Sequence, residues 1–97
     1  MNTIVVTRHP ALVSLLKERG ILTGDCSVLE HVTPDDVRGR RVVGILPFHL
    51  ACLAESVVVL DLALTPEDRK AGELPIERLR EIAGKAEIYC VRKVTPV

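Results

Sequence analysis

Residues 3–10 read Thr-Ile-Val-Val-Thr-Arg-His-Pro, and this stretch decides the fold. The apolar run at its start is typical of a short strand that is buried on both faces. Pro10 favours the first position of a helix, because its fixed φ and missing N–H suit that place. Leucines at helical spacing follow, and Gly20 is a natural C-terminal stop. A strand that leads directly into a helix indicates an α/β fold.

The rest of the chain continues this alternation. Strands are predicted at 3–7, 26–32, 41–46, 56–62 and 87–94, and helices at 10–20, 48–55 and 75–84. Residues 33–36 are predicted as a turn or a single helical turn, and 63–74 as a polar loop. We therefore expect residues 1–97 to form a single Rossmann-like domain, a three-layer sandwich around a mostly parallel sheet of about five strands. The last strand is a candidate edge strand, for which an antiparallel direction remains open.

Composition excludes several classes of protein. The 97 residues carry 13 basic and 13 acidic side chains, and 47% of them are apolar. That apolar content is far above the range of disordered chains, and the length allows one domain. Only Phe48 and Tyr89 are aromatic, so the ring set that usually stacks unpaired bases is missing. With no basic excess, long RNA or DNA is not an expected partner.

The sequence also bears on the localisation of the protein and on its need for a metal or cofactor. It contains no apolar stretch long enough to span a membrane and no features of a signal peptide, so we expect a cytoplasmic protein. Cys26, Cys52 and Cys90 are widely spaced, and we expect each to be a buried, reduced thiol. Without a CxxC pair or an acidic cluster, no metal or other cofactor is expected.

Candidate site residues follow from the rule that such sheets bind ligands beyond the carboxyl ends of their strands. The first strand ends in Thr7-Arg8-His9-Pro10, at a helix start that favours an anion. Arg8 is a candidate for binding phosphate oxygens through two parallel hydrogen bonds, and His9 for proton transfer near neutral pH. In the alternative interpretation His9 only caps the helix and Arg8 forms a surface ion pair.

A second set of candidates follows the later strands. Gly44 within a strand indicates close approach by another backbone or by a ligand. His49 is a further proton carrier near the same edge, and Arg69 is a candidate to close over an anion. The alternatives are helix packing for Gly44, a structural role for His49, and a solvated cluster of Arg69 with Glu67 and Asp68.

These residues resemble a known family, the small CRISPR-associated proteins written Csx-sixteen, which occur beside type III CRISPR systems. Members open with a strand leading into Ser/Thr-Arg-His-Pro, here Thr7-Arg8-His9-Pro10. A later strand runs into Gly-x-Leu-Pro, here Gly44-Ile45-Leu46-Pro47. Further matches are Gly20-Ile21, Leu62-Ala63-Leu64, Pro66, Arg69 and Glu73-Leu74. The resemblance covers nearly the whole chain and keeps its order.

The resemblance implies a role in antiviral defence. Type III systems make cyclic adenylates when they detect foreign RNA, and the family looks like a ring nuclease that binds and cleaves cyclic tetra-adenylate to end the signal. The first alternative is a sponge protein that binds the ring without cutting it. Two others are a phosphatase-like enzyme with His9 as nucleophile and a structural subunit of a larger CRISPR complex.

The candidate residues fit such a metal-independent reaction, in which each ribose 2′-OH attacks its own 3′-phosphate. Arg8 is expected to stabilise charge on the phosphoryl oxygens, with His9 protonating the leaving oxygen or Thr7 positioning the 2′-OH. A two-fold homodimer would present the same patch twice to the ring. Leu46, Leu64 and Phe48 are candidates for the wall around the adenines. The expected ligand-binding residues are Pro10, Gly44, Leu46, Pro47, His49, Leu64 and Arg69.

Overall fold

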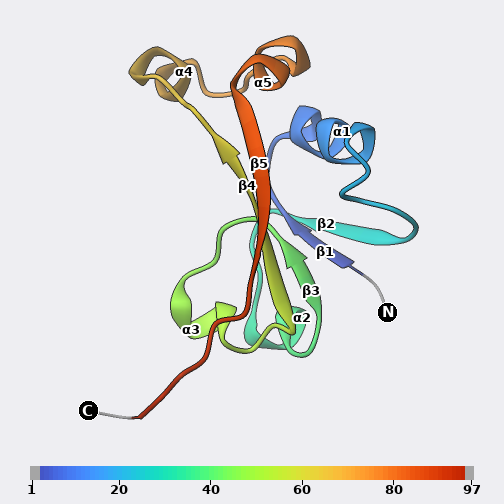
Figure 1. Cartoon of the computed structure of the whole chain (residues 1–97), viewed down its shortest axis with the longest axis vertical. Helices are drawn as coiled ribbons and strands as arrows, with labels where there is room; N and C mark the ends of the chain where they lie inside the picture. Colours follow the sequence, from blue (N-terminus) through green and yellow to red (C-terminus); the bar gives the residue numbers. More distant parts are fainter. Residues whose placement is uncertain (1–2, 96–97) are drawn as a thin grey trace.

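The computed structural model describes residues 3–95 and contains one five-stranded sheet with helices on both faces (Figure 1). The elements along the chain are β1 (Thr3–Val6), α1 (Pro10–Glu18), β2 (Cys26–Leu29), α2 (Pro34–Val37), β3 (Arg41–Val43), α3 (Phe48–Ala51), β4 (Ser56–Leu62), α4 (Pro66–Ala71), α5 (Ile76–Ile82) and β5 (Ala83–Tyr89). Across the sheet the strands are ordered β2-β1-β3-β4-β5. The α/β class and the five strands are thus as the sequence predicts.

The direction of β5, which the sequence leaves open, makes the sheet mixed. The pairings of β1 with β2 and β3, and of β3 with β4, are parallel, whereas β4 and β5 pair antiparallel. The sheet is therefore mixed, and the expectation of a mostly parallel sheet is wrong. Strand β5 begins at Ala83 directly after α5, and Ala83 pairs with Leu62 at the end of β4. The chain therefore runs back along β4 in the opposite direction.

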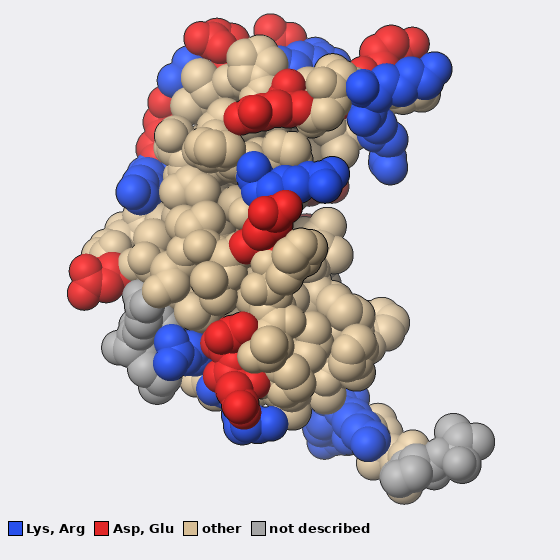
Figure 2. Space-filling view, turned by 180° about the vertical axis from the view of Figure 1, so that it is seen from behind, with Lys and Arg blue, Asp and Glu red and all other residues tan. Residues whose placement is uncertain are grey.

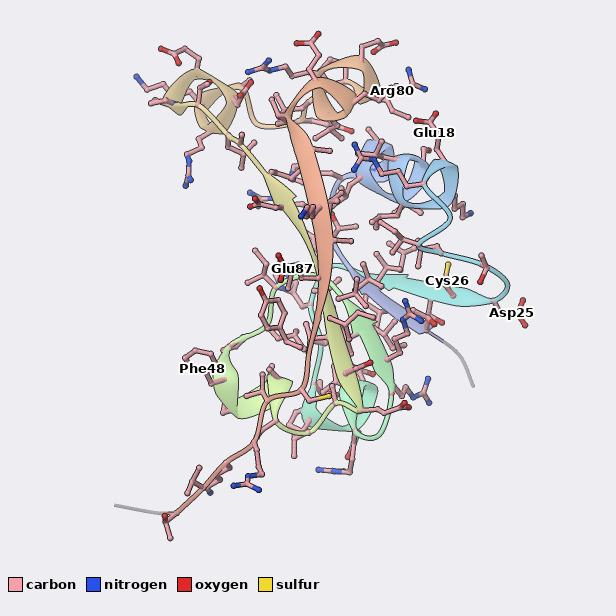
Figure 3. All side chains as sticks on the ribbon, in the orientation of Figure 1. Glu18, Asp25, Cys26, Phe48, Arg80 and Glu87 are labelled. Atoms are coloured by element: carbon pink, nitrogen blue, oxygen red, sulfur yellow. The ribbon has the colours of Figure 1, made fainter. Side chains whose placement is uncertain are left out.

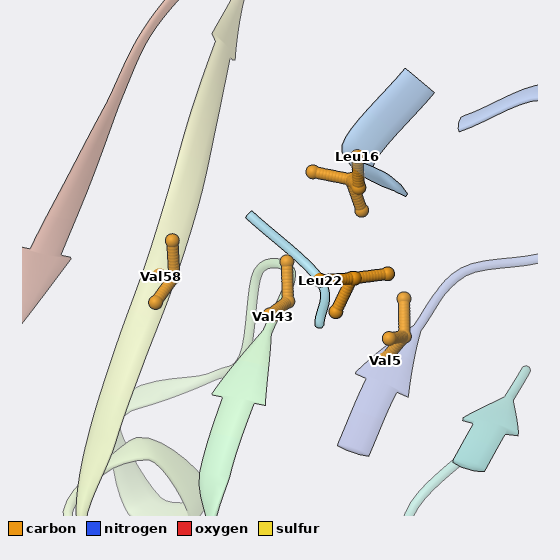
Figure 4. Packing of buried hydrophobic residues seen from close by; sticks show 5 residues of the cluster. All are labelled: Val5, Leu16, Leu22, Val43 and Val58. Carbon is orange, nitrogen blue, oxygen red and sulfur yellow. The ribbon is translucent and has the colours of Figure 1, made fainter. Parts of the chain in front are cut away.

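The core on one face of the sheet lies under α1. Val5, Val43 and Val58 project from three neighbouring strands and pack with Leu16 and Leu22 (Figure 4). Leu15 of α1 forms a second cluster on this side with α5 residues. Helices α1 and α5 therefore cover the same face.

Residues that alternate with these valines pack on the opposite face. Ile4 and Val42 contact Val37 of α2 and Leu50 of α3, and all four are buried. This double covering explains why β1 and β3 are apolar without alternation. Both core layers consist of aliphatic side chains.

Several boundaries differ from the sequence prediction. The expected loop at 63–74 contains helix α4, the second strand stops at Leu29 and the third at Val43. Strand β5 begins at Ala83, directly after α5, and ends at Tyr89. The cysteines are free, but Cys26 and Cys52 are half-buried and Cys90 is exposed, so the expectation of buried thiols is wrong for Cys90.

The surface carries both signs of charge. On the face shown in Figure 2, basic and acidic side chains are interspersed. None of the helices within residues 3–95 has the length and apolar character that crossing a membrane requires.

Gly44 stands at the end of β3, where two strands come close together. Its φ is +139°, and a Cβ at this position would lie 2.7 Å from the carbonyl oxygen of Val6. The amide of Gly44 donates to the carbonyl of Val58 at 2.9 Å. The close approach inferred from the sequence is therefore that of another backbone.

We expect Gly44→Ala to destabilise the fold by about 3 kcal/mol or more, because the methyl group meets the backbone of β1 and the φ angle is strained. Gly24→Ala is the matched control: Gly24 also has a positive φ, but no atom lies within 4 Å of its added Cβ. That variant should lose only about 1–2 kcal/mol. Urea unfolding followed by circular dichroism measures both, and equal losses would contradict the steric explanation.

Candidate functional site

Two hydrogen bonds fix the conformation of the loop between β1 and α1. The amide of Thr7 donates to the carbonyl of Leu29 at 3.0 Å, which extends the β1–β2 pairing. The hydroxyl oxygen of Thr7 accepts the amide of His9 at 3.1 Å. The hydroxyl proton of Thr7 is not used in that bond and remains able to donate.

The side chains of Arg8 and His9, unlike that of Thr7, make no hydrogen bond or ion pair within residues 3–95. His9 is the N-cap residue of α1, but its side chain makes no capping hydrogen bond. Within residues 3–95, Arg8 forms no hydrogen bond or ion pair through its guanidinium. The structural alternatives considered for these two residues, a cap and a surface ion pair, are therefore not what the structure contains.

A pocket of about 240 Å³ lies between this loop and α4, and we call it the arginine pocket. Its charged and titratable lining residues are Arg8 and His9 from the loop and Asp68 and Arg69 from α4. The apolar lining consists of Leu12, Leu62, Leu64, Leu74 and Leu79. Two guanidiniums at the rim of a leucine-lined pocket are suited to an anion that carries an apolar or planar group.

Arg69 is available because its neighbour takes a different partner. Asp68 is buried and binds Arg78 of α5 through two hydrogen bonds, both of 2.9 Å. The exposed side chain of Arg69 has no ion pair or side-chain hydrogen bond among the residues described. In the alternative of a solvated cluster of Arg69 with Glu67 and Asp68, Asp68 is therefore not a member, whereas Glu67 and Arg69 are exposed.

Asp68 also begins the helix that carries Arg69. Its carboxylate accepts both the amide and the hydroxyl of Thr65 at 3.0 Å, and the Thr65 hydroxyl accepts the amide of Asp68 at 3.2 Å. This capping box fixes the first turn of α4. The two hydrogen bonds from Arg78, followed by those from Thr65, lower the pKa of Asp68 well below its usual range. The carboxylate thus stays ionised and holds α4 against α5.

Helix α5 is in turn fixed to α1, which brings Leu79 to the pocket. Arg80 donates two hydrogen bonds to Glu18, at 2.9 and 2.7 Å (Figure 3). These bonds lower the pKa of Glu18 and raise that of Arg80. Arg19 donates to the carbonyls of Gly84 and Ala83, at 2.7 and 3.2 Å. The three elements around the arginine pocket are therefore joined in series, α4 to α5 and α5 to α1.

Strand β4 extends beyond its neighbour β3. Their pairing ends with Val43 opposite Val58, and no other described strand lies along this edge of β4 from Val59 to Leu62. Because alternate residues direct their main-chain groups to the same edge, the N–H and C=O of Leu60 face this gap.

A second hollow of about 210 Å³ occupies the gap and continues the arginine pocket. It is lined by Gly44, Ile45, Val59 and Leu60, among others. It shares Leu12 and Leu62 with the arginine pocket. Together the two hollows form one groove across the carboxyl ends of β1, β3 and β4, which we call the carboxyl-edge groove.

The sequence-predicted site residues are divided among several places. Arg8, His9, Leu64 and Arg69 meet at the arginine pocket, and Gly44 lies further along the carboxyl-edge groove. Thr7 and Pro10 line a neighbouring hollow with Arg8, His9 and residues of β2.

The remaining candidates lie elsewhere. Leu46 and His49 line two other hollows beside α3, and Pro47 is the N-cap residue of α3. In one chain these three residues do not reach the arginine pocket. The chain leaves β3 toward the opposite face of the sheet from α1, which separates them.

Sequence reasoning missed the residues that build the pocket wall. Asp68 was read as part of a solvated cluster, and Arg78 was not considered. The signal was present, because Thr65-Pro66-Glu67-Asp68 has the spacing of a capping box with proline at the first helical position. No group of three or more His, Cys, Asp or Glu side chains that could hold a metal occurs within residues 3–95.

Comparison with known proteins gives one match. A family model described as "Putative CRISPR-associated protein (Cas_VVA1548)" matches residues 4–92. Neither the curated proteins nor the solved structures gave a match.

We expect Asp68→Asn to lower the melting temperature by roughly 5 °C or more, because it weakens both the α4 cap and the contact with α5. Asp36→Asn is the matched control, since Asp36 forms the same capping box with Thr33 but no hydrogen bond to an arginine. Its effect should be smaller. Equal effects would show that the contact with Arg78 adds nothing.

The pH dependence of stability provides a second test. A lowered pKa in the folded state means that the stabilisation by Asp68 is complete at neutral pH and is lost as the pH falls below ~4 toward the folded-state pKa. Melting temperatures between pH 7 and pH 2 should therefore fall more steeply for the wild type than for Asp68→Asn.

Proposed function

Since the chain belongs to the CRISPR-associated family whose model matches it, we propose that it is a ring nuclease of a type III CRISPR system. In this proposal it binds and cleaves cyclic tetra-adenylate and so ends the signal that the ring carries. The observation that supports it best is the arginine pocket, where Arg8 and Arg69 stand without partners among the described residues over a leucine lining. The choice of the ring as substrate rests on the resemblance to the Csx-sixteen family. That resemblance is carried by Thr7-Arg8-His9-Pro10 and Gly44-Ile45-Leu46-Pro47.

The groove offers a different partner to each part of a nucleotide. Guanidiniums bind phosphate oxygens through paired hydrogen bonds, and Arg8 and Arg69 are free to do so. A planar base fits against leucines such as Leu12 and Leu62, which lie between the two hollows. The N–H and C=O of Leu60 supply a donor and an acceptor for the edge of the base. A site of this kind needs few aromatic residues, in agreement with the composition.

The chemistry requires no group beyond the chain and the ring. The ribose 2′-oxygen attacks the adjacent phosphorus, its proton passes to solvent water, and the bond from phosphorus to the 5′-oxygen breaks. The products are a 2′,3′-cyclic phosphate and a 5′-OH, which takes up a proton. Arg8 stabilises the charge on the phosphoryl oxygens, and His9 donates the proton to the leaving oxygen. Thr7, whose hydroxyl proton is free, positions the 2′-OH.

We propose a homodimer in the cytoplasm as the working form. A ring of four phosphates has approximate rotational symmetry, and two copies related by a two-fold axis present the same groups twice. Two arginine pockets would supply four guanidiniums for four phosphates.

Incubation of the protein with cyclic tetra-adenylate in EDTA tests the proposal. We expect shorter adenylates that end in a 2′,3′-cyclic phosphate and carry a 5′-OH, identified by mass spectrometry. A ring that remains intact over many equivalents but binds tightly would replace the enzyme by the sponge alternative. A ring that neither binds nor breaks would contradict both.

Substitution of the free arginines tests the site. We expect Arg8→Ala to slow cleavage by ~10²–10³-fold or more, since it removes a donor to the developing charge. Arg69→Ala should weaken binding by about tenfold, the equivalent of one charged contact. Arg41→Ala is the matched control, because Arg41 is exposed at the opposite end of β3 and its guanidinium has no ion pair within residues 3–95. Cleavage at the wild-type rate by Arg8→Ala would show that the site is wrong.

His9→Ala separates proton transfer from positioning. Removal of a proton donor typically costs ~10²–10⁴-fold in rate. If alignment of the 2′-OH contributes most, we expect the loss to be smaller than for Arg8→Ala. Single-turnover rates with saturating protein measure both variants, and a phosphohistidine trapped in the wild type would instead indicate the phosphatase-like alternative.

A further inference from the structure

Both aromatic residues of the chain lie outside its core. Phe48 is 82% exposed and Tyr89 49% exposed, and with the 80% exposed Ile45 they line a single hollow of about 330 Å³. Figure 3 shows Phe48 projecting from α3 away from the rest of the molecule. We call this hollow the Phe48 surface; its other lining residues are Leu46, Ala51, Val57, Val59 and Val91. Exposed apolar groups gathered in one place mark an interaction site.

The Phe48 surface lies on the sheet face opposite α1. Val58 packs under α1, so its neighbours Val57 and Val59 point to the other face. Tyr89 pairs with Val57 and Glu87 with Val59, which places Tyr89 and Glu87 on that same face of β5. Nearly all of β5 is exposed, in contrast to the buried β1. An exposed edge strand of this kind offers a surface on which another chain can bind.

The rim of this surface is charged, with opposite signs at different places. Glu87 stands beside Tyr89 on β5, two residues away. His49, Arg92 and Lys93 line an adjoining hollow that shares Phe48 and Val91 with the Phe48 surface. A two-fold axis through the surface exchanges these regions, so that the acid of one copy can approach the cations of the other.

We propose that the Phe48 surface is where a second copy of the chain binds. A surface with an apolar centre and both signs of charge at its rim is complementary to itself. A membrane or a polynucleotide would instead favour cations alone, and the chain as a whole has a net charge of zero. Phe48 and Tyr89 are the aromatic anchors of this interface. Aromatic side chains are among the residues that contribute most to the binding energy of protein interfaces.

The interface also bears on the candidate site. The Phe48 surface shares Ile45 and Val59 with the carboxyl-edge groove, so a second copy seated there covers one end of the groove. The inference rests on the proposed function only in taking a pair of chains as the working form. It makes the residues that lie far from Arg8 in one chain, such as His49, part of the interface.

Neighbouring positions of β5 give a matched test. Phe48→Glu and Tyr89→Glu place a charge on the proposed interface, whereas Ile88→Glu places it on the opposite face of the same strand, at a residue that is 65% exposed. Sedimentation equilibrium without ligand measures self-association. We expect a wild-type dimer, an unchanged dimer for Ile88→Glu, and dissociation constants raised at least about thirtyfold for the other two, since each change occurs twice per dimer. Circular dichroism checks that each variant is folded.

The outcomes separate this inference from the proposed function. A wild type that stays monomeric, or a Phe48→Glu variant that dimerises as the wild type does, overturns the interface whether or not the ring is cleaved. A folded Phe48→Glu monomer beside a dimeric Ile88→Glu supports it, even if no variant cleaves cyclic tetra-adenylate. In that last case the proposed function fails and the interface stands.

Discussion

The ion pair of Asp68 with Arg78 joins α4 and α5, the two helices that form one side of the arginine pocket. A carboxylate that is 8% exposed would be unfavourable without a partner, and the two hydrogen bonds from Arg78 provide it. The same carboxylate caps α4, so the ordering of this helix and its attachment to α5 depend on one group. Because Asp68 is committed to Arg78, the adjacent Arg69 keeps its charge free at the rim. Asp68 thus contributes to the stability of the fold, and its neighbour Arg69 is left available for binding an anion.

The unequal lengths of β3 and β4 leave the space of the second hollow, which adjoins the pocket that Asp68 lines. Strand β3 ends at Val43, where Gly44 turns the chain under the carbonyl of Val6, and β4 continues to Leu62. Main-chain groups of β4 are therefore left facing a gap between α1 and the sheet. A longer β3 would fill this gap with a strand and leave no groove.

The sequence predicted most elements because local signals agreed with the fold. Residues 3–10 combine an apolar run with a proline at a helix start, and both the strand and the helix are present. Helix α4 was missed because its charges resemble a solvated loop, although Thr65 and Asp68 have capping spacing. The direction of β5 follows from its start beside the end of β4, and periodicity alone does not fix that position. The grouping of Arg8 with Arg69, and the separation of both from His49, depends on which face of the sheet each connection crosses. No single residue pattern encodes that choice.

Because its core is aliphatic, the protein absorbs and fluoresces only weakly in the near ultraviolet. The chain has no tryptophan and a single tyrosine, so its intrinsic fluorescence arises from Tyr89. This residue is half exposed, on a strand whose side chains are almost all open to solvent. Rearrangements among the valines and leucines of the interior would hardly alter that signal. A molecule that covers Tyr89 would change it directly, so the protein carries a natural optical reporter for one surface.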